Sequence, residues 1–267
     1  MPSIQAEGGG APGAVSPDDE TPARTAPSAR SGRWLAVVLA GGILILAAVI
    51  VLVVAIRQHR QSAAAELRPS GIPSSVSTSL ADLMSLSPVP VRPAPGFTLT
   101  DQHGQPLAMS ALRGKVVVLE FMDPHCTDIC PLVSAEFVAA YHDLGPLAAR
   151  VVFAAVNVNP YHATVRDVTL FSDEHQLTSI PDWHFFTGPL ASLQAVWRGY
   201  DIVVQPRGPN ADVVHTSSVY FIDPQGRERY LAAPMADYTA AGAAYLPPGQ
   251  IAAWGRGIAL VARSLAA

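Results

Sequence analysis

Cys126 and Cys130 are the only cysteines in the 267-residue chain, and they stand four positions apart. They follow residues 115–122 (KVVVLEFM), which have the composition of a buried strand. They precede residues 131–144, where apolar residues recur at helical spacing. The thiols are therefore expected at the N-terminal end of a helix, where free N–H groups and the helix dipole lower the pKa of a thiol.

The spacing of the two cysteines suits more than one kind of chemistry. Four positions place both sulfurs on one side of the chain if the turn is helical. The pair could then form a reversible disulfide, or hold one soft metal ion between two thiolates. Two buried cysteines acting as small hydrophobes are the third interpretation. That interpretation is disfavoured because the chain places both of its cysteines in this one turn.

A closed Cu(I) site needs a third ligand beside two thiolates. The best-placed candidate is His215, which stands directly before the apolar segment at residues 218–222 (SVYFI). His125 adjoins Cys126, but a sequence neighbour can point away from the pair. His59 is too close to a long apolar segment to reach it. The remaining histidines fall in predicted turns, helices or strands: His103, His142, His162, His175 and His184.

The elements around these residues predict an α/β domain. Apolar runs alternate with segments of helical periodicity, and a late hairpin and a final helix follow. We expect a mixed central sheet flanked by helices, in one domain over residues 95–267. The predicted strands are 115–122, 150–156, 183–186, 218–222 and 228–231, and the predicted helices are 131–144, 164–175, 190–200 and 251–265.

The N-terminal part has a different composition. Residues 34–56 form 23 consecutive uncharged and mostly apolar positions. A helix of that length spans about 35 Å, enough for a hydrocarbon core of about 30 Å. We expect a single transmembrane helix that anchors the chain in the lipid bilayer, because the apolar core of a cleaved signal peptide is shorter and closer to the N-terminus. Residues 1–33 are predicted to be a disordered cytoplasmic tail, and residues 57–94 a Pro/Ser-rich linker.

Charge and composition exclude several classes of protein. The formal net charge is −4, which lacks the basic surface expected of a nucleic-acid-binding protein. Two cysteines are too few for a disulfide-rich scaffold. Three arginines precede the apolar segment and three follow it, so charge does not fix the orientation in a membrane.

Several segments of the predicted domain resemble those of a known family. The opening of the domain, residues 97–121, is similar to that of the thioredoxin-like superfamily. The C-x-x-x-C-P run at 126–131 resembles the Sco/SenC copper-chaperone family and differs from the C-x-x-C of thioredoxins. His215, the strand after it and residues 223–226 (DPQG) match that family's downstream histidine region. Residues 183–188 (WHFFTG) resemble its strand-to-Thr-Gly segment.

This resemblance carries expectations about fold and site. It implies a thioredoxin-like fold and a copper ion, Cu(I) or Cu(II), bound by Cys126, Cys130 and His215. It also implies an N-terminal membrane anchor. The chain departs from the family at residues 127–129 (TDI), where Pro-Asp is usual, and at 157–162 (NVNPYH), where acids are usual. We therefore expect a divergent branch.

Two functions from different classes follow from these features. The first is a copper metallochaperone that gives copper to an oxidase subunit or another apo copper protein, and so helps build the copper centre of cytochrome c oxidase. The second is an extracytoplasmic thiol-disulfide oxidoreductase that uses Cys126 and Cys130 as its redox pair. A peroxiredoxin-like peroxidase is disfavoured because residues 123–125 (DPH) poorly replace a Thr/Pro-lined pocket. Both main functions place residues 57–267 outside the plasma membrane, on a single-pass protein.

Overall fold

The computed structural model describes residue 39, residues 42–58 and residues 70–267. The chain divides into two units, residues 1–61 and 62–267. In the first unit, residues 42–58 are helical and their apolar side chains are exposed. Within the described stretches, no helix has both the length and the apolar character needed to cross a membrane. The expected span at 34–56 lies partly outside the described residues, and the expected tail at 1–33 lies wholly outside them.

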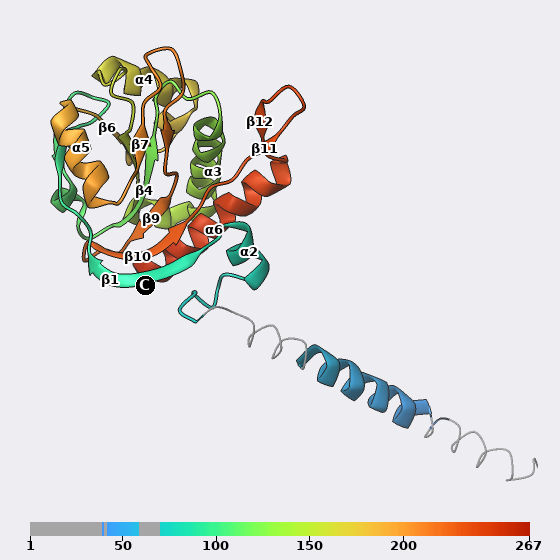
Figure 1. The fold of residues 1–267 in the computed structure, drawn as a ribbon. Coiled ribbons are helices and arrows are strands. Elements are labelled where there is room, and N and C mark those ends of the chain that lie inside the picture. The colour runs from blue at the N-terminus through green and yellow to red at the C-terminus, as the bar shows by residue number, and fades with distance from the viewer. Residues whose placement is uncertain (1–38, 40–41, 59–69) are drawn as a thin grey trace, which may run out of the picture. The chain divides into compact units, whose positions relative to one another are not determined.

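The second unit is built on a six-stranded sheet with the strand order β1-β10-β9-β4-β5-β6 (Figure 1). The central strand β4 pairs in parallel with β5 and antiparallel with β9. The sheet is therefore mixed, as the sequence predicts. Its strands are β1 (Ser87–Pro93), β4 (Val116–Met122), β5 (Val151–Asn157), β6 (Trp183–Phe186), β9 (Val219–Ile222) and β10 (Arg227–Ala232).

Helices cover both faces of this sheet. The strands β4 and β5 are buried at every position, because successive side chains point to opposite, covered faces. Val116 and Val118 join one apolar cluster, and Val117 and Leu119 join the other. Side chains of α3 (Ile129–Leu144), α4 (Val165–Glu174) and α6 (Pro248–Ala266) fill the first cluster. Side chains of α5 (Leu190–Gly199) fill the second.

The contact between α3 and α6 is close and depends on a glycine. A Cβ at Gly255 would lie 2.6 Å from the Cβ of Ala139 and 2.9 Å from the backbone nitrogen of Ala140. Small residues on both helices therefore let the two backbones approach. This contact holds α3, the helix that follows the cysteine turn, against the final helix of the chain.

The start of the domain differs from the expectation. Residues 78–93 fall in the predicted linker, yet they form α2 (Thr78–Leu83) and β1. Strand β1 is an edge strand that pairs with β10. It contains Pro88, Pro90 and Pro93, which cannot donate to a ladder and are tolerated at a sheet edge. The prolines read as an extended spacer in the sequence, and in the structure they belong to the folded domain.

The predicted helices and strands of the domain are confirmed, with no end shifted by more than three residues. The remaining elements are short. They are β2 (Thr98–Thr100), β3 (Pro106–Ala108), β7 (Val204–Gln205), β8 (Val214–His215), β11 (Asp237–Tyr238), β12 (Ala244–Tyr245) and the 3₁₀ turns at Met109–Leu112, Gly145–Arg150 and Leu177–Ser179. Their strands pair in three separate two-stranded sheets, β2-β3, β7-β8 and β11-β12.

Candidate metal centre

The two cysteines lie where β4 is followed by α3, at the N-terminal end of the helix as predicted. The strand ends at Met122 and the helix begins at Ile129, so Cys126 is in the connecting turn and Cys130 is in the first helical turn. Both are free thiols and both are buried, with 9% of Cys126 and 2% of Cys130 exposed. Cys126 is thus the sulfur nearer to solvent.

The electrostatic environments of the two thiols are opposite. A hydrogen bond from the Cys130 thiol lowers the pKa of Cys126, and backbone N–H groups of Cys130 and Asp128 add to this effect against the cost of burial. The same hydrogen bond and burial raise the pKa of Cys130 well above its ordinary value. Cys126 is therefore the more acidic thiol of the pair.

His215 ends the short strand β8 and is half-buried. Its Nδ1 lies 2.9 Å from the carbonyl oxygen of Thr216. Because a carbonyl only accepts, Nδ1 carries the proton and Nε2 keeps a free lone pair. Burial lowers the pKa of His215, so the ring is neutral near pH 7. A neutral imidazole with a fixed tautomer is the form that ligates a metal.

A buried carboxylate that the sequence did not single out joins the surrounding loops. Asp123 Oδ1 accepts hydrogen bonds from the backbone N–H of His125 (2.8 Å) and from Asn159 Nδ2 (2.8 Å). Asp123 Oδ2 accepts from the backbone N–H of Val213, at 3.2 Å. One side chain thus ties the cysteine turn to the loop after β5 and to the segment that leads to His215.

The expected ligands are not all in mutual contact. Cys126 and Cys130 are hydrogen-bonded, whereas the ligand atoms of Cys126, Cys130 and His215 do not all lie within 4.8 Å of one another. Over residues 42–58 and 70–267, the set that meets this distance is His125, His162 and Asp167. A three-ligand site would require these atoms to come closer together, and this ligand set stays a prediction.

Two buried acids were also missed from the sequence: Glu120, whose charge acts on Cys130, and Glu136, which feels the charge of Glu120. Glu120 Oε1 accepts hydrogen bonds from Ser217 Oγ and from the backbone N–H of Ser218, both at 3.1 Å. Neither carboxyl oxygen of Glu136 has a hydrogen-bond partner. Burial raises the pKa of Glu120 to about 8 and that of Glu136 to about 9, so both are protonated near neutral pH. In the sequence, the one indication of Glu120 is that it is a single acidic residue inside an apolar predicted strand.

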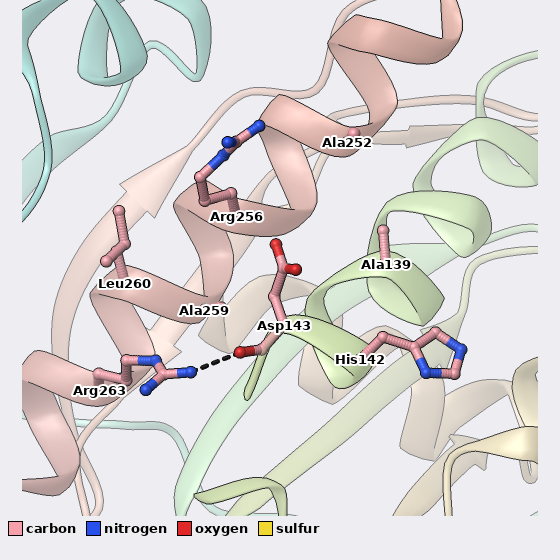
Figure 2. A pocket seen from close by; sticks show the side chains of 8 residues that line it. All are labelled: Ala139, His142, Asp143, Ala252, Arg256, Ala259, Leu260 and Arg263. Atoms are coloured by element: carbon pink, nitrogen blue, oxygen red, sulfur yellow. Dashed lines mark hydrogen bonds between the residues drawn. The ribbon is translucent and has the colours of Figure 1, made fainter. Parts of the chain in front are cut away.

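A surface hollow lies between α3 and α6 (Figure 2). Arg263 lies over it and donates to the backbone oxygen of Asp143. His142, which also lines it, is twelve residues along α3 from Cys130, or about 18 Å at 1.5 Å per residue. The hollow therefore takes no part in the chemistry of the thiols. It is lined by Ala139, His142, Asp143, Ala252, Arg256, Ala259, Leu260 and Arg263.

The family assignment follows from comparison with known proteins. Residues 90–243 match the family described as SCO1/SenC, which is more than half of the chain and includes all three expected ligands. The chain belongs to the SCO1/SenC family. One protein similar to this chain is the SCO1 protein homolog of Bacillus subtilis (strain 168), which is 27% identical over 140 residues. That match spans 49% of this chain and 68% of the relative.

A solved structure to which this chain is similar has the same fold. Apo Sco1 from Thermus thermophilus matches with a TM-score of 0.50 and 24% identity, over 66% of this chain and 93% of that one. This likeness confirms the expected thioredoxin-like α/β fold. A structure of ScoI from Bradyrhizobium japonicum with copper bound has a TM-score of 0.49 and 20% identity, over 65% of this chain and 99% of that one.

Proposed function

We propose that this SCO1/SenC protein binds copper through Cys126, Cys130 and His215 and hands it to the copper centre of cytochrome c oxidase during assembly. The observation that carries the proposal is the donor set: a thiol with a lowered pKa, a second thiol in contact with it, and a neutral imidazole with Nε2 free. Thiolates are soft ligands that suit Cu(I), and imidazole suits both copper states.

The framework around Asp123 supports a site that accepts and releases its cargo. Asp123 holds the cysteine turn and the start of the His215 segment through hydrogen bonds, while the ligand atoms of Cys126, Cys130 and His215 do not all lie within 4.8 Å of one another. Binding of one ion by all three ligands would require the set to close around it. Such closing on an otherwise fixed frame suits transfer to a partner better than permanent storage.

The alternative is an extracytoplasmic thiol-disulfide oxidoreductase. The opposite pKa shifts of Cys126 and Cys130 favour it, because a nucleophilic thiolate beside a protonated partner is the arrangement used in thiol-disulfide exchange. His215 separates the two functions. A reductase does not need its imidazole, whereas a three-ligand copper site does.

The test is a Cu(I) competition titration of the full chain in detergent. We expect Cys126→Ala and Cys130→Ala to abolish tight binding and His215→Ala to weaken it at least tenfold, while the His215→Ala protein still forms the disulfide. His142→Ala, on the exposed face of α3, is the matched control and should bind like the parent. Parent-like affinity in His215→Ala would make His215 structural and favour the reductase.

We also propose that the chain is a single-pass protein of the plasma membrane, with residues 57–267 outside and 1–33 inside. The support is the 23-residue uncharged segment at 34–56 and the need of the thiols for a compartment where their redox state can change. A reporter fused after Ala267 should be active only on the outer side. Activity confined to the cytoplasm would contradict this topology.

A further inference from the structure

A cluster of two histidines and an aspartate lies beside the cysteine turn. His125 follows β4, His162 follows β5, and Asp167 is in the first turn of α4, so the three converge near the carboxyl ends of two parallel strands. Their ligand atoms all lie within 4.8 Å of one another. The two rings stack with centroids 3.5 Å apart and an interplanar angle of 17°. His125 Nε2 is 3.6 Å from Asp167 Oδ1.

Two of the three side chains are oriented by partners outside the cluster. His162 Nε2 is 2.7 Å from the carbonyl oxygen of Pro209, so Nε2 carries the proton and Nδ1 keeps a free lone pair. Asp167 Oδ2 accepts hydrogen bonds from the backbone N–H (3.0 Å) and Oγ1 (2.6 Å) of Thr164. This leaves Asp167 Oδ1 to face His125. Such outer partners are typical of histidines and carboxylates that ligate metals.

We propose that His125, His162 and Asp167 form a second metal site, separate from the thiols, for a divalent first-row cation. Two imidazole nitrogens and one carboxylate oxygen are donors of intermediate softness, and Cu²⁺ is the divalent ion such donors bind most tightly. The three residues leave at least one coordination position open to water. The proposal does not rest on the proposed function, since no sulfur takes part.

The cluster can adopt ligand geometry with a small movement. Metal–imidazole bonds are about 2.0–2.1 Å, so a bound ion draws the ligand atoms together and turns the stacked rings apart. His125 is exposed, with 49% of its side chain accessible, and can make this turn without disturbing the core. His162 and Asp167 are half-buried and held by Pro209 and Thr164, so they supply the fixed part of the site.

The test uses the full chain carrying Cys126→Ser, Cys130→Ser and His215→Ala, which removes the thiol site. Aerobic titration with Cu²⁺, followed by electron paramagnetic resonance, should show one equivalent bound with hyperfine structure from two imidazole nitrogens. Adding His125→Ala or His162→Ala should lower the affinity at least tenfold and remove one nitrogen from the spectrum. Asp167→Asn should lower the affinity without changing the nitrogen count.

The experiment has a control variant, and two outcomes would contradict the second metal site. His142→Ala in the same background should leave affinity and spectrum unchanged, and circular dichroism should show that each variant is folded. Because His125 is exposed, His125→Ala alone decides the matter if His162→Ala does not fold. The proposal is overturned if the background protein binds no Cu²⁺, or if His125→Ala binds it with parent affinity. A negative result in this experiment would not change the interpretation of the Cu(I) titration, because that titration depends on different residues.

Discussion

Asn159 Nδ2 donates a 2.8 Å hydrogen bond to Asp123 Oδ1, and the two residues are 36 positions apart in the chain. Both side chains are fully or almost fully buried, at 1% and 0% exposure. The bond fixes the loop after β5 to the turn that carries the thiols. In turn, Asn159 Oδ1 accepts from the backbone N–H of Tyr161 at 2.9 Å, which shapes the loop in front of His162.

Replacing Asp123 should destabilise the domain and loosen the site. Asp123→Ala leaves the N–H groups of His125 and Val213 and the amide of Asn159 without an acceptor. Each unpaired buried group costs about 1–3 kcal/mol, so losing the acceptor of all three should lower the free energy of unfolding by at least about 3 kcal/mol. Urea denaturation measures it. Asp123→Asn keeps one acceptor oxygen and should lose less, and equal stability of parent and Asp123→Ala would refute the role assigned to this carboxylate.

Cys126 should react before Cys130 with an alkylating agent. It is the more exposed sulfur, and its lowered pKa makes the thiolate available at lower pH than for an ordinary cysteine. We expect iodoacetamide to modify Cys126 at least tenfold faster in the reduced native protein, measured by peptide mass spectrometry between pH 6 and 9. Cys130→Ala removes the hydrogen-bond donor and should move the Cys126 profile to higher pH. Equal and negligible labelling of both thiols would mean that they are inert core residues.

Glu136 should make the stability of the domain depend on pH. Its pKa is raised from 4.5 to about 9 in the folded protein, so above pH 4.5 the unfolded chain releases a proton that the folded chain keeps. Stability contributed by this group is present below pH 4.5 and is lost as the pH rises toward 9. The slope for one group is at most about 1.4 kcal/mol per pH unit.

Glu136→Gln removes this titration, so its stability advantage over the parent should grow between pH 5 and 8. Urea denaturation at each pH measures the difference. The matched control is Glu174→Gln on the exposed end of α4, which should show no such trend. A difference between Glu136→Gln and the parent that is constant with pH would mean that Glu136 is ionised in the folded state.

Adding one methyl group between α3 and α6 should be costly. In Gly255→Ala the new Cβ would meet Ala139 and the backbone of Ala140 at under 3.0 Å, so a helix must shift. We expect a loss of about 1–3 kcal/mol, as for other overpacked cores. Gly249→Ala, at the start of α6, meets nothing within 4 Å and should be neutral or slightly stabilising. Thermal denaturation of both variants tests the contact, and equal melting temperatures would contradict it.

The parts of the fold that sequence could predict are those with strong local signals. The apolar run at 115–122 became β4, and the helical periodicity at 131–144 became most of α3. The strand-turn-helix position of the cysteines followed from these two. Strand β1 was not predicted, because its proline-rich sequence shows no alternation of apolar and polar residues. It is a strand because it pairs with β10.

The rest of the site depends on contacts between distant residues. Nothing near Asp123 in the sequence reveals that Asn159 and Val213 will donate to it. His125 was set aside as a neighbour that can point away from the thiols, and the structure has it stacked on His162. The sequence shows that residues 157–162 depart from the family pattern. It does not show how this loop packs, and the packing is what places His162 beside His125.

The hydrogen bond from Val213 to Asp123 also bears on when the proposed copper site can form. These partners are 90 residues apart, and His215 follows Val213 by two. At about 5–20 residues per second, a ribosome needs about 5–18 s to extend the chain from the cysteine turn to that segment. An ion that needs both thiols and His215 can therefore be bound only after the ribosome has added residue 215. Binding of the ion then follows synthesis of this part of the domain.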